Sequence, residues 1–181
     1  MISEVRSRGT GGAGDEFVEL YNPTNAPITL DSAWKLEGRS NSATSYNARW
    51  TGTGKVIPAH GHFLIAYTGY TQAPAADEAL SSGITDATSL RLVQSGTMVD
   101  AVCYAFDTAS QMPFLSDATY TCEGMPATNP HNNATTTNDD ASIERKPGGA
   151  AGNCTDSGDN ATDFALTMPA TPMSSQSAPT P

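Results

Sequence analysis

The hydrophobic residues of this chain gather in short runs, and Gly, Pro, Asn or Ser bounds each run. Short apolar runs between turn-forming residues are typical of β-strands rather than of helices. A chain with many such strands and frequent turns folds as a sandwich or a barrel. The clearest runs predict strands over residues 2–7, 16–22, 33–37, 62–67, 89–93 and 98–104, and weaker runs predict strands over 28–30, 46–50, 142–145 and 163–167.

Local patterns refine this prediction. Apolar residues occur on both faces of the run 16–22, as expected for an inner strand. Ser95-Gly96 separates two strand-like runs and predicts a tight hairpin. Only residues 75–80 have a helix-forming composition, and they predict one or two helical turns. The pattern fades between residues 106 and 140, where we expect a long loop excursion.

Composition alone points toward disorder. Leu, Ile, Val and Phe make up 26 of 181 residues and the formal net charge is −10, a combination typical of unfolded chains. The apolar residues are clustered rather than spread evenly, so we expect a modest core with long loops. The length is typical of one domain. We expect that domain over residues 1–172 and a Pro/Ser/Thr-rich linker over 173–181, the chain being a piece of a longer protein.

The acidic balance argues against two classes of partner. With 9 Lys and Arg against 19 Asp and Glu, the chain is poorly suited to bind nucleic acid phosphates or an anionic membrane surface. No apolar stretch reaches the roughly 18 residues of a membrane-spanning helix, and the first residues lack the pattern of a signal peptide. We therefore expect no nucleic acid partner and no insertion into a membrane.

A set of short motifs resembles a known family. The opening strands, a Pro-x-x-Gly turn that leads into a strand, three later strands and a C-terminal segment match it in order over nearly the whole chain. Together these segments resemble the lamin tail domain as found in secreted bacterial proteins. The segments that carry the resemblance are residues 2–5, 16–23, 28–30, 34–36, 57–64, 90–92, 98–102, 142–145, 159–164 and 169–172.

The resemblance implies an immunoglobulin-like antiparallel β-sandwich, here with long loops. It also implies an accessory or binding role beside other extracellular modules, without catalysis. Two segments depart from the family pattern, namely the Gly-rich insertion at residues 9–14 and the long segment at 106–140. Because one fold hosts many functions, the resemblance does not decide the ligand.

The three cysteines predict one disulfide and one free thiol. Cys122 and Cys154 lie in loop-like stretches, whereas Cys103 lies within an apolar strand. We predict a Cys122–Cys154 disulfide, with Cys103 as a free, buried thiol that packs like a small hydrophobic side chain. The alternative pairing is Cys103 with Cys122. Either disulfide is consistent with an oxidising compartment.

An acidic loop near the C-terminus offers a candidate calcium site. Asp156, Asp159, Asn160 and Asp163 surround a glycine within eight residues, and Ca²⁺ takes six to eight oxygen ligands from flexible loops. The spacing is not that of an EF-hand. The alternative is that Asp163 caps a turn while the other carboxylates are solvated. Calcium is the candidate cofactor of this chain.

No motif of a known catalytic centre is present. The chain has neither G-x-S-x-G nor H-E-x-x-H. Glu4, Glu16 and Glu19 are carboxylates in or beside strands, and we expect them to pair with basic residues. The basic residues available for this pairing are Arg6, Arg145 and Lys146.

We expect an exported, non-catalytic module that attaches a neighbouring domain to a cell-surface polysaccharide or protein. One alternative is a structural spacer without a ligand. Another is a carboxylate-based hydrolase that uses Glu19 and Asp163. Trp50 is a candidate for a partly exposed surface that stacks on carbohydrate.

Overall fold

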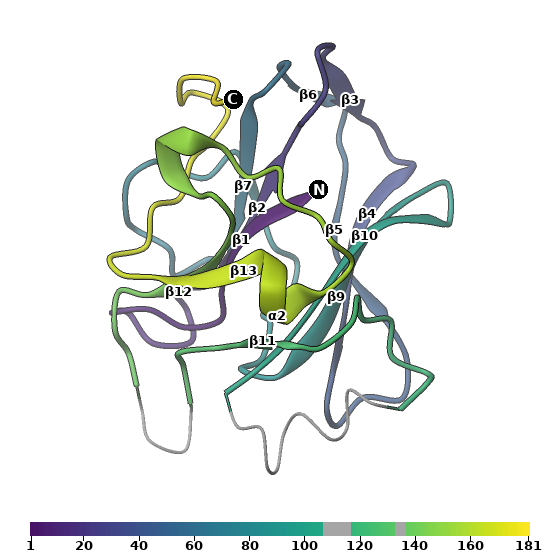
Figure 1. Ribbon diagram of the computed structural model, residues 1–181, viewed down its shortest axis with the longest axis vertical. Coiled ribbons are helices and arrows are strands. Elements are labelled where there is room, and N and C mark those ends of the chain that lie inside the picture. Colours follow the sequence, from purple (N-terminus) through teal and green to yellow (C-terminus); the bar gives the residue numbers. More distant parts are fainter. Residues whose placement is uncertain (107–116, 133–136) are drawn as a thin grey trace.

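The computed structural model describes residues 1–106, 117–132 and 137–181. Two β-sheets form separate layers, as Figure 1 shows. The first is a six-stranded sheet, in the order β13 (Phe164–Thr167), β12 (Ser142–Arg145), β1 (Ile2–Arg6), β2 (Phe17–Tyr21), β7 (His62–Ala66) and β8 (Glu78–Ala79). The second is a five-stranded sheet, in the order β11 (Ala127–Thr128), β10 (Thr97–Ala105), β9 (Thr88–Gln94), β4 (Trp34–Ser40) and β5 (Asn47–Thr51).

Small elements complete the sandwich. Strands β3 (Ile28–Leu30) and β6 (Lys55–Ile57) pair with each other. A 3₁₀ turn, η1, covers Gly149–Ala151, and a one-turn helix, α2, covers Asn160–Asp163. Most strand pairs are antiparallel, but the short edge strands β8 and β11 run parallel to β7 and β10. The prediction of an all-β, immunoglobulin-like sandwich with long loops is therefore confirmed.

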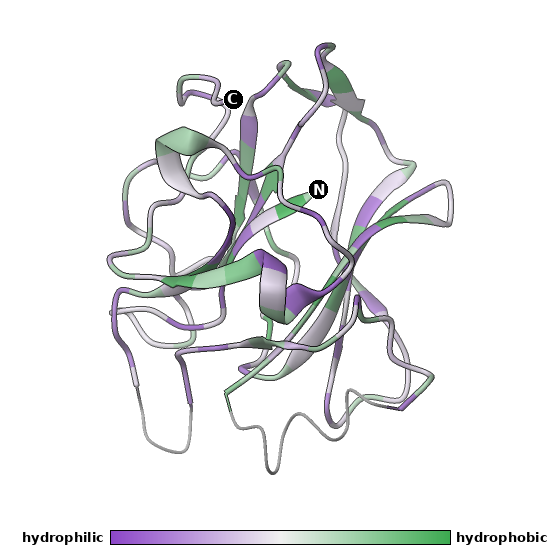
Figure 2. Ribbon diagram, in the orientation of Figure 1, coloured by the Kyte–Doolittle hydropathy of each residue, from purple (hydrophilic) through white to green (hydrophobic). Residues whose placement is uncertain are grey.

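The hydrophobic core lies between the two sheets. In β2, Val18 and Leu20 face this core, while Glu19 points to the opposite side. A register shift in β1 between Ile2 and Glu4 lets both Ile2 and Val5 join the core although they are three positions apart. Figure 2 shows that hydrophobic residues are concentrated on the strands of both layers. The second sheet contributes Trp34, Leu36, Trp50, Leu90, Leu92, Val102 and Tyr104.

Each strand predicted from the sequence occurs, with ends that differ by at most three residues. The hairpin at Ser95-Gly96 is confirmed as well. Both residues have positive φ, 51° and 79°, which is the backbone of the tight turn that follows the twist of two strands.

The helix predicted over residues 75–80 is wrong. This segment instead forms the parallel edge strand β8, because the Asp77 and Leu80 N–H groups donate to the Leu64 and Ala66 carbonyls of β7. A helix this short has too few internal hydrogen bonds to compete with such pairing. Within the described ranges, no helix is long and apolar enough to cross a membrane.

Candidate functional site

Three glutamates lie side by side on the outer face of the six-stranded sheet. Glu4 of β1 is the register partner of Glu144 on β12 and of Glu19 on β2. Their exposed fractions are 0%, 5% and 0%. Like charges directly opposite each other in a sheet are unfavourable, so this carboxylate row (Glu4, Glu19 and Glu144) requires compensation from its surroundings.

Hydroxyl, imidazole and backbone groups provide that compensation. The Ser142 hydroxyl donates to Glu4 Oε1 at 2.5 Å, and the Ser3 hydroxyl donates to Glu19 Oε1 at 2.6 Å. The Gly149 N–H donates to Glu144 at 2.5 Å. The His62 imidazole contacts Glu19. The expectation that these carboxylates pair with Arg6, Arg145 or Lys146 is wrong.

The basic residues expected to pair with the row have other partners. Arg6 pairs with Asp15 at 2.7 Å, and Arg145 pairs with Asp100 at 2.9 Å. Lys146 donates to the Thr162 carbonyl.

The C-terminal strap, residues 168–181, covers the carboxylate row. The Thr171 and Met173 N–H groups donate to Glu4 Oε1 at 3.1 Å and to Glu19 Oε2 at 2.5 Å. Ala170 packs against an apolar patch on this face, formed by Phe17, Leu64 and Ala66. In Figure 1 the strap is the yellow segment that runs beside β7 to the C-terminus.

The last residues of the strap are also held, although the sequence predicts a linker over 173–181. The Ser175 N–H donates to Asp77 at 2.9 Å, and the Thr180 N–H donates to the His60 carbonyl at 2.9 Å. The Tyr21 hydroxyl donates to the Pro181 carbonyl at 2.6 Å. The composition of the strap suits an extended chain. The outer face of the sheet supplies its hydrogen-bond partners, which the sequence pattern does not reveal.

Glu19, His62 and Thr180 form a chain of hydrogen bonds with the geometry of a catalytic triad. His62 Nδ1 lies 2.8 Å from Glu19 Oε1, and His62 Nε2 lies 3.0 Å from Thr180 Oγ1. Such a chain activates a hydroxyl only where a substrate can reach it. Here His62 is fully buried, Thr180 is 7% exposed, and the Tyr21 ring packs on the imidazole. The arrangement anchors the strap to the sheet.

Burial raises the pKa of Glu4 well above 4.5, and the neighbouring Glu19 carboxylate raises it further. A raised pKa in the folded protein stabilises the fold fully below pH 4.5, and that stabilisation is lost as pH rises toward the folded-state pKa. Glu4→Gln, which stays neutral, should therefore melt at a higher temperature than the wild type above neutral pH, by about 3 °C. Near pH 4 the two should melt together.

Melting curves from pH 4 to pH 9 measure this difference. Asp139→Asn, an exposed residue with the same change in net charge, is the control. A Glu4→Gln variant whose melting temperature parallels the wild type at every pH would contradict the raised pKa.

An open hollow of mixed charge lies where the β1–β2 and β8–β9 connections meet. Its volume is about 560 Å³, within the range of small-molecule sites. The Arg8 Nε and Asp86 Oδ2 atoms lie 3.6 Å apart, and the Ser7 hydroxyl donates to Asp86 at 2.8 Å. The lining residues include Arg8, Ala13, Glu16, Tyr67, Thr85 and Asp86.

Glu16 is the unusual carboxyl of this hollow. Its Oε2 accepts the Ile84 N–H at 2.7 Å. Burial raises its pKa to about 8, with a smaller contribution from the Asp86 carboxylate. At neutral pH the Glu16 carboxyl is therefore mostly protonated, and it can both donate and accept a hydrogen bond.

The sequence model of the Lamin Tail Domain family matches residues 1–105. The match covers more than half of the chain and ends at the last residue of β10. The chain belongs to this family. A search of curated proteins found no match. Strands β12 and β13, which follow the matched region, complete the six-stranded sheet of this lamin tail domain.

The disulfide of the lamin tail domain joins Cys103 and Cys122, with Cα atoms 5.3 Å apart. The predicted Cys122–Cys154 disulfide is wrong, and the alternative pairing is correct. Cys154 is a free, exposed cysteine. Val102 and Tyr104 face the main core, so the alternation of β10 turns Cys103 toward the outer face of its sheet.

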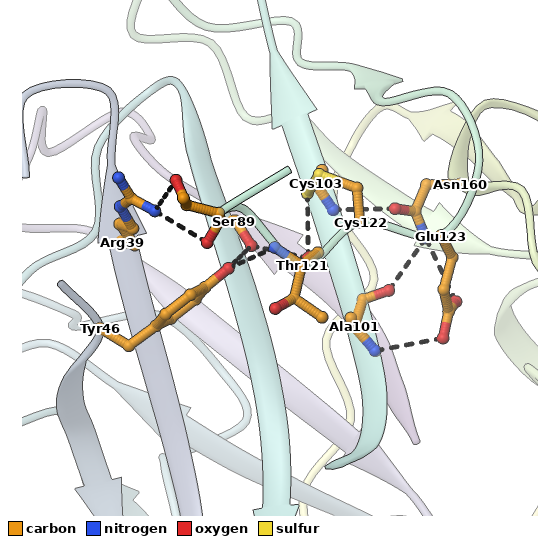
Figure 3. The surroundings of a disulfide bond; sticks show 10 residues. Arg39, Tyr46, Ser89, Ala101, Cys103, Thr121, Cys122, Glu123 and Asn160 are labelled. Carbon is orange, nitrogen blue, oxygen red and sulfur yellow. Dashed lines mark hydrogen bonds between the residues drawn. A yellow bond between two sulfur atoms is a disulfide. The ribbon is translucent and has the colours of Figure 1, made fainter. Parts of the chain in front are cut away.

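Figure 3 shows what the disulfide holds in place. The chain around Cys122 lies on the outer face of the five-stranded sheet, where the Ser89 hydroxyl donates to the Thr121 carbonyl at 2.8 Å. Arg39 donates to the Thr119 carbonyl at 2.8 Å. Connecting segments thus cover the outer faces of both sheets.

Replacing both bonded cysteines, Cys103→Ala with Cys122→Ala, should lower the free energy of unfolding by about 3 kcal/mol, the loop-closure value for this separation of 19 residues. Urea denaturation measures the loss, and Cys154→Ala is the matched control because its thiol is exposed and unbonded. Alkylation followed by mass mapping should modify Cys154 alone in the oxidised protein. Modification of Cys103 or Cys122 in that sample would contradict the pairing.

The four residues of the candidate calcium site do not converge as a ligand set. Asp163 accepts hydrogen bonds from the Ser157 N–H and hydroxyl, at 2.9 and 2.6 Å. Asp159 caps helix α2 by accepting from the Thr162 N–H.

The other two candidate ligands are also engaged. Asn160 bonds to β10 through the Cys103 N–H and the Ala101 carbonyl. Asp156 lies 3.6 Å from Arg145. No group of three or more His, Cys, Asp or Glu side chains among the described residues is arranged to hold a metal ion.

The pair of carboxylates considered for a hydrolase is not assembled either. Glu19 is bound by Ser3, His62 and the strap, whereas Asp163 is bound by the turn before α2. Trp50, the candidate stacking surface, is only 3% exposed and belongs to the core.

Proposed function

We propose that this lamin tail domain is a non-catalytic extracellular module of a larger secreted bacterial protein. It attaches that protein to a cell-surface polysaccharide or protein. The observation that carries the proposal is that two candidate sites differ in their accessibility to solvent. The triad-like chain of Glu19, His62 and Thr180 is buried where the strap meets the sheet, whereas the mixed-charge hollow is open to solvent.

Further features support this proposal. The Cys103–Cys122 disulfide fits an oxidising compartment. The net charge of −10 disfavours binding to nucleic acid. The described strands belong to one sandwich with an immunoglobulin-like architecture, which presents loops for recognition on a rigid scaffold.

Retention on cells tests the proposal. The fluorescently labelled chain is incubated with intact cells of the source organism, washed and quantified. We expect saturable retention. Loss of retention after protease treatment of the cells identifies a protein partner, and persistence identifies a polysaccharide. Retention no greater than that of an unrelated acidic protein of equal size would favour the spacer and overturn the proposal.

Catalysis is tested separately. Glycan, ester and phosphate substrates should show no turnover above background. Turnover that disappears in Glu19→Gln, with the melting temperature unchanged, would favour the hydrolase over the module.

A further inference from the structure

The mixed-charge hollow is one of three neighbouring hollows on the surface. A second hollow, of about 480 Å³, shares Tyr67 with the first. A third, of about 450 Å³, shares Glu78 and Ala79 with the second. We call this row of three hollows the β8 groove, because its middle lies along edge strand β8. Because adjoining hollows share lining residues, one extended ligand can contact all three.

Charged side chains of the β8 groove have partners within the protein. Arg8 faces Asp86, with the charged atoms 3.6 Å apart. Glu78 accepts hydrogen bonds from Trp50 Nε1 and from the Thr53 hydroxyl. The linings of the second and third hollows contain a single charged side chain, Glu78, so most contacts with a ligand there would be uncharged. The net charge of −10 further disfavours a polyanion.

Uncharged hydrogen-bonding groups and aromatic rings complete the lining. The threonines at positions 51, 68 and 71 are exposed along the groove. Tyr67 and Tyr70 are half-buried and form part of its walls. Hydroxyl groups both donate and accept hydrogen bonds, and an aromatic face packs against C–H groups. These two features match a ligand with hydroxyls at its edges and C–H groups on its faces.

We propose that the β8 groove binds a neutral polysaccharide chain, with sugar units in successive hollows and Tyr67 between the first two. This proposal rests on the proposed attachment function and assigns it a site and a ligand class. The Glu16 carboxyl at one end contributes a hydrogen-bond donor at neutral pH.

Two blocking variants test the site. Ala13 and Ala76 are exposed residues that line the first and second hollows. Ala13→Trp and Ala76→Trp would each fill a hollow while leaving the hydrogen bonds described above intact. The matched control is Ala150→Trp, at an exposed residue of η1 that lines neither of these hollows. Melting temperatures equal to that of the wild type establish that the variants fold.

Calorimetric titration uses neutral hexasaccharides of glucose, mannose and N-acetylglucosamine, an acidic oligogalacturonate and a cationic glucosamine oligomer. We expect the wild type and Ala150→Trp to bind at least one neutral oligosaccharide. Both blocking variants should bind it about tenfold or more weakly. Equal affinity in the blocking variants would overturn the site. Binding of only the charged oligomers, or of no oligosaccharide, would overturn the ligand class.

The cell assay separates this proposal from the attachment function. Wild-type retention that persists in both blocking variants means that the domain attaches through another surface, and only the β8 groove proposal fails. Absence of retention by the wild type itself overturns the attachment function.

Discussion

Removal of residues 173–181 is expected to lower the free energy of unfolding by about 4 kcal/mol, since hydrogen bonds each contribute roughly 1 kcal/mol. The truncation removes the Met173 N–H that donates to Glu19 and the Thr180 hydroxyl beside His62. It also removes the Pro181 carbonyl that accepts from Tyr21. Glu19 and His62 would each exchange one protein partner for water.

Urea denaturation of the full chain and of the truncated chain measures this loss. Gln176→Ala is a control within the strap, because this side chain is exposed and its amide donates to the adjacent Ser175. It should unfold at the wild-type urea concentration. A truncated chain that also unfolds there would show that residues 173–181 behave as the linker that their composition predicts.

The strap explains why the carboxylate row escapes sequence analysis. In β2, Val18 and Leu20 face the core, and Glu19 lies on the other side together with Phe17 and Tyr21. The apolar residues on that side indicate that it is covered as well, but the pattern does not show which segment covers it. Burial arises because a segment about 150 residues later in the chain lies over it, as the Met173–Glu19 contact shows. The periodicity of a strand indicates which side chains share a face of the sheet. It does not indicate whether a segment distant in the sequence covers that face.

The disulfide is a different case, because the sequence does contain the decisive pattern. Apolar Val102 and Tyr104 flank Cys103, and strict alternation places Cys103 on the face away from them. A cysteine on that face is accessible to a covering loop, and Cys122 lies in such a loop. The predicted Cys122–Cys154 pairing is wrong because it counts both faces of this strand as core.

The hollows of the β8 groove depend on elements that local sequence describes poorly. Strand β8 has only two residues, Glu78 and Ala79, and its pairing with β7 replaces the predicted helix. Tyr67 follows directly after β7, so its position at the groove depends on how the connections at this end of the sandwich pack. The sequence predicts the two layers well. The surfaces formed by their loops can be predicted only once the positions of the two layers are known.

Arg145 joins the two sheets, and Arg145→Met is expected to cost about 4 kcal/mol of unfolding free energy, as for other broken buried ion pairs. The guanidinium of β12 contacts both carboxylate oxygens of Asp100 on β10, at 2.9 and 3.1 Å. It also donates to the Ile2 carbonyl at 2.9 Å and packs on the Phe164 ring. Methionine fills part of the volume but leaves the Asp100 charge without its basic partner.

The chain offers a matched control for this substitution. Arg91 and Glu37 form an ion pair at 2.7 Å with side chains 32% and 19% exposed. Arg91→Met should therefore cost less than about 1 kcal/mol. A double variant, Arg145→Met with Asp100→Leu, should be more stable than the sum of the two single losses predicts, because it removes both charges. Urea denaturation of these variants measures the costs, and equal losses for Arg145→Met and Arg91→Met would refute the role of Arg145 as a tie between the sheets.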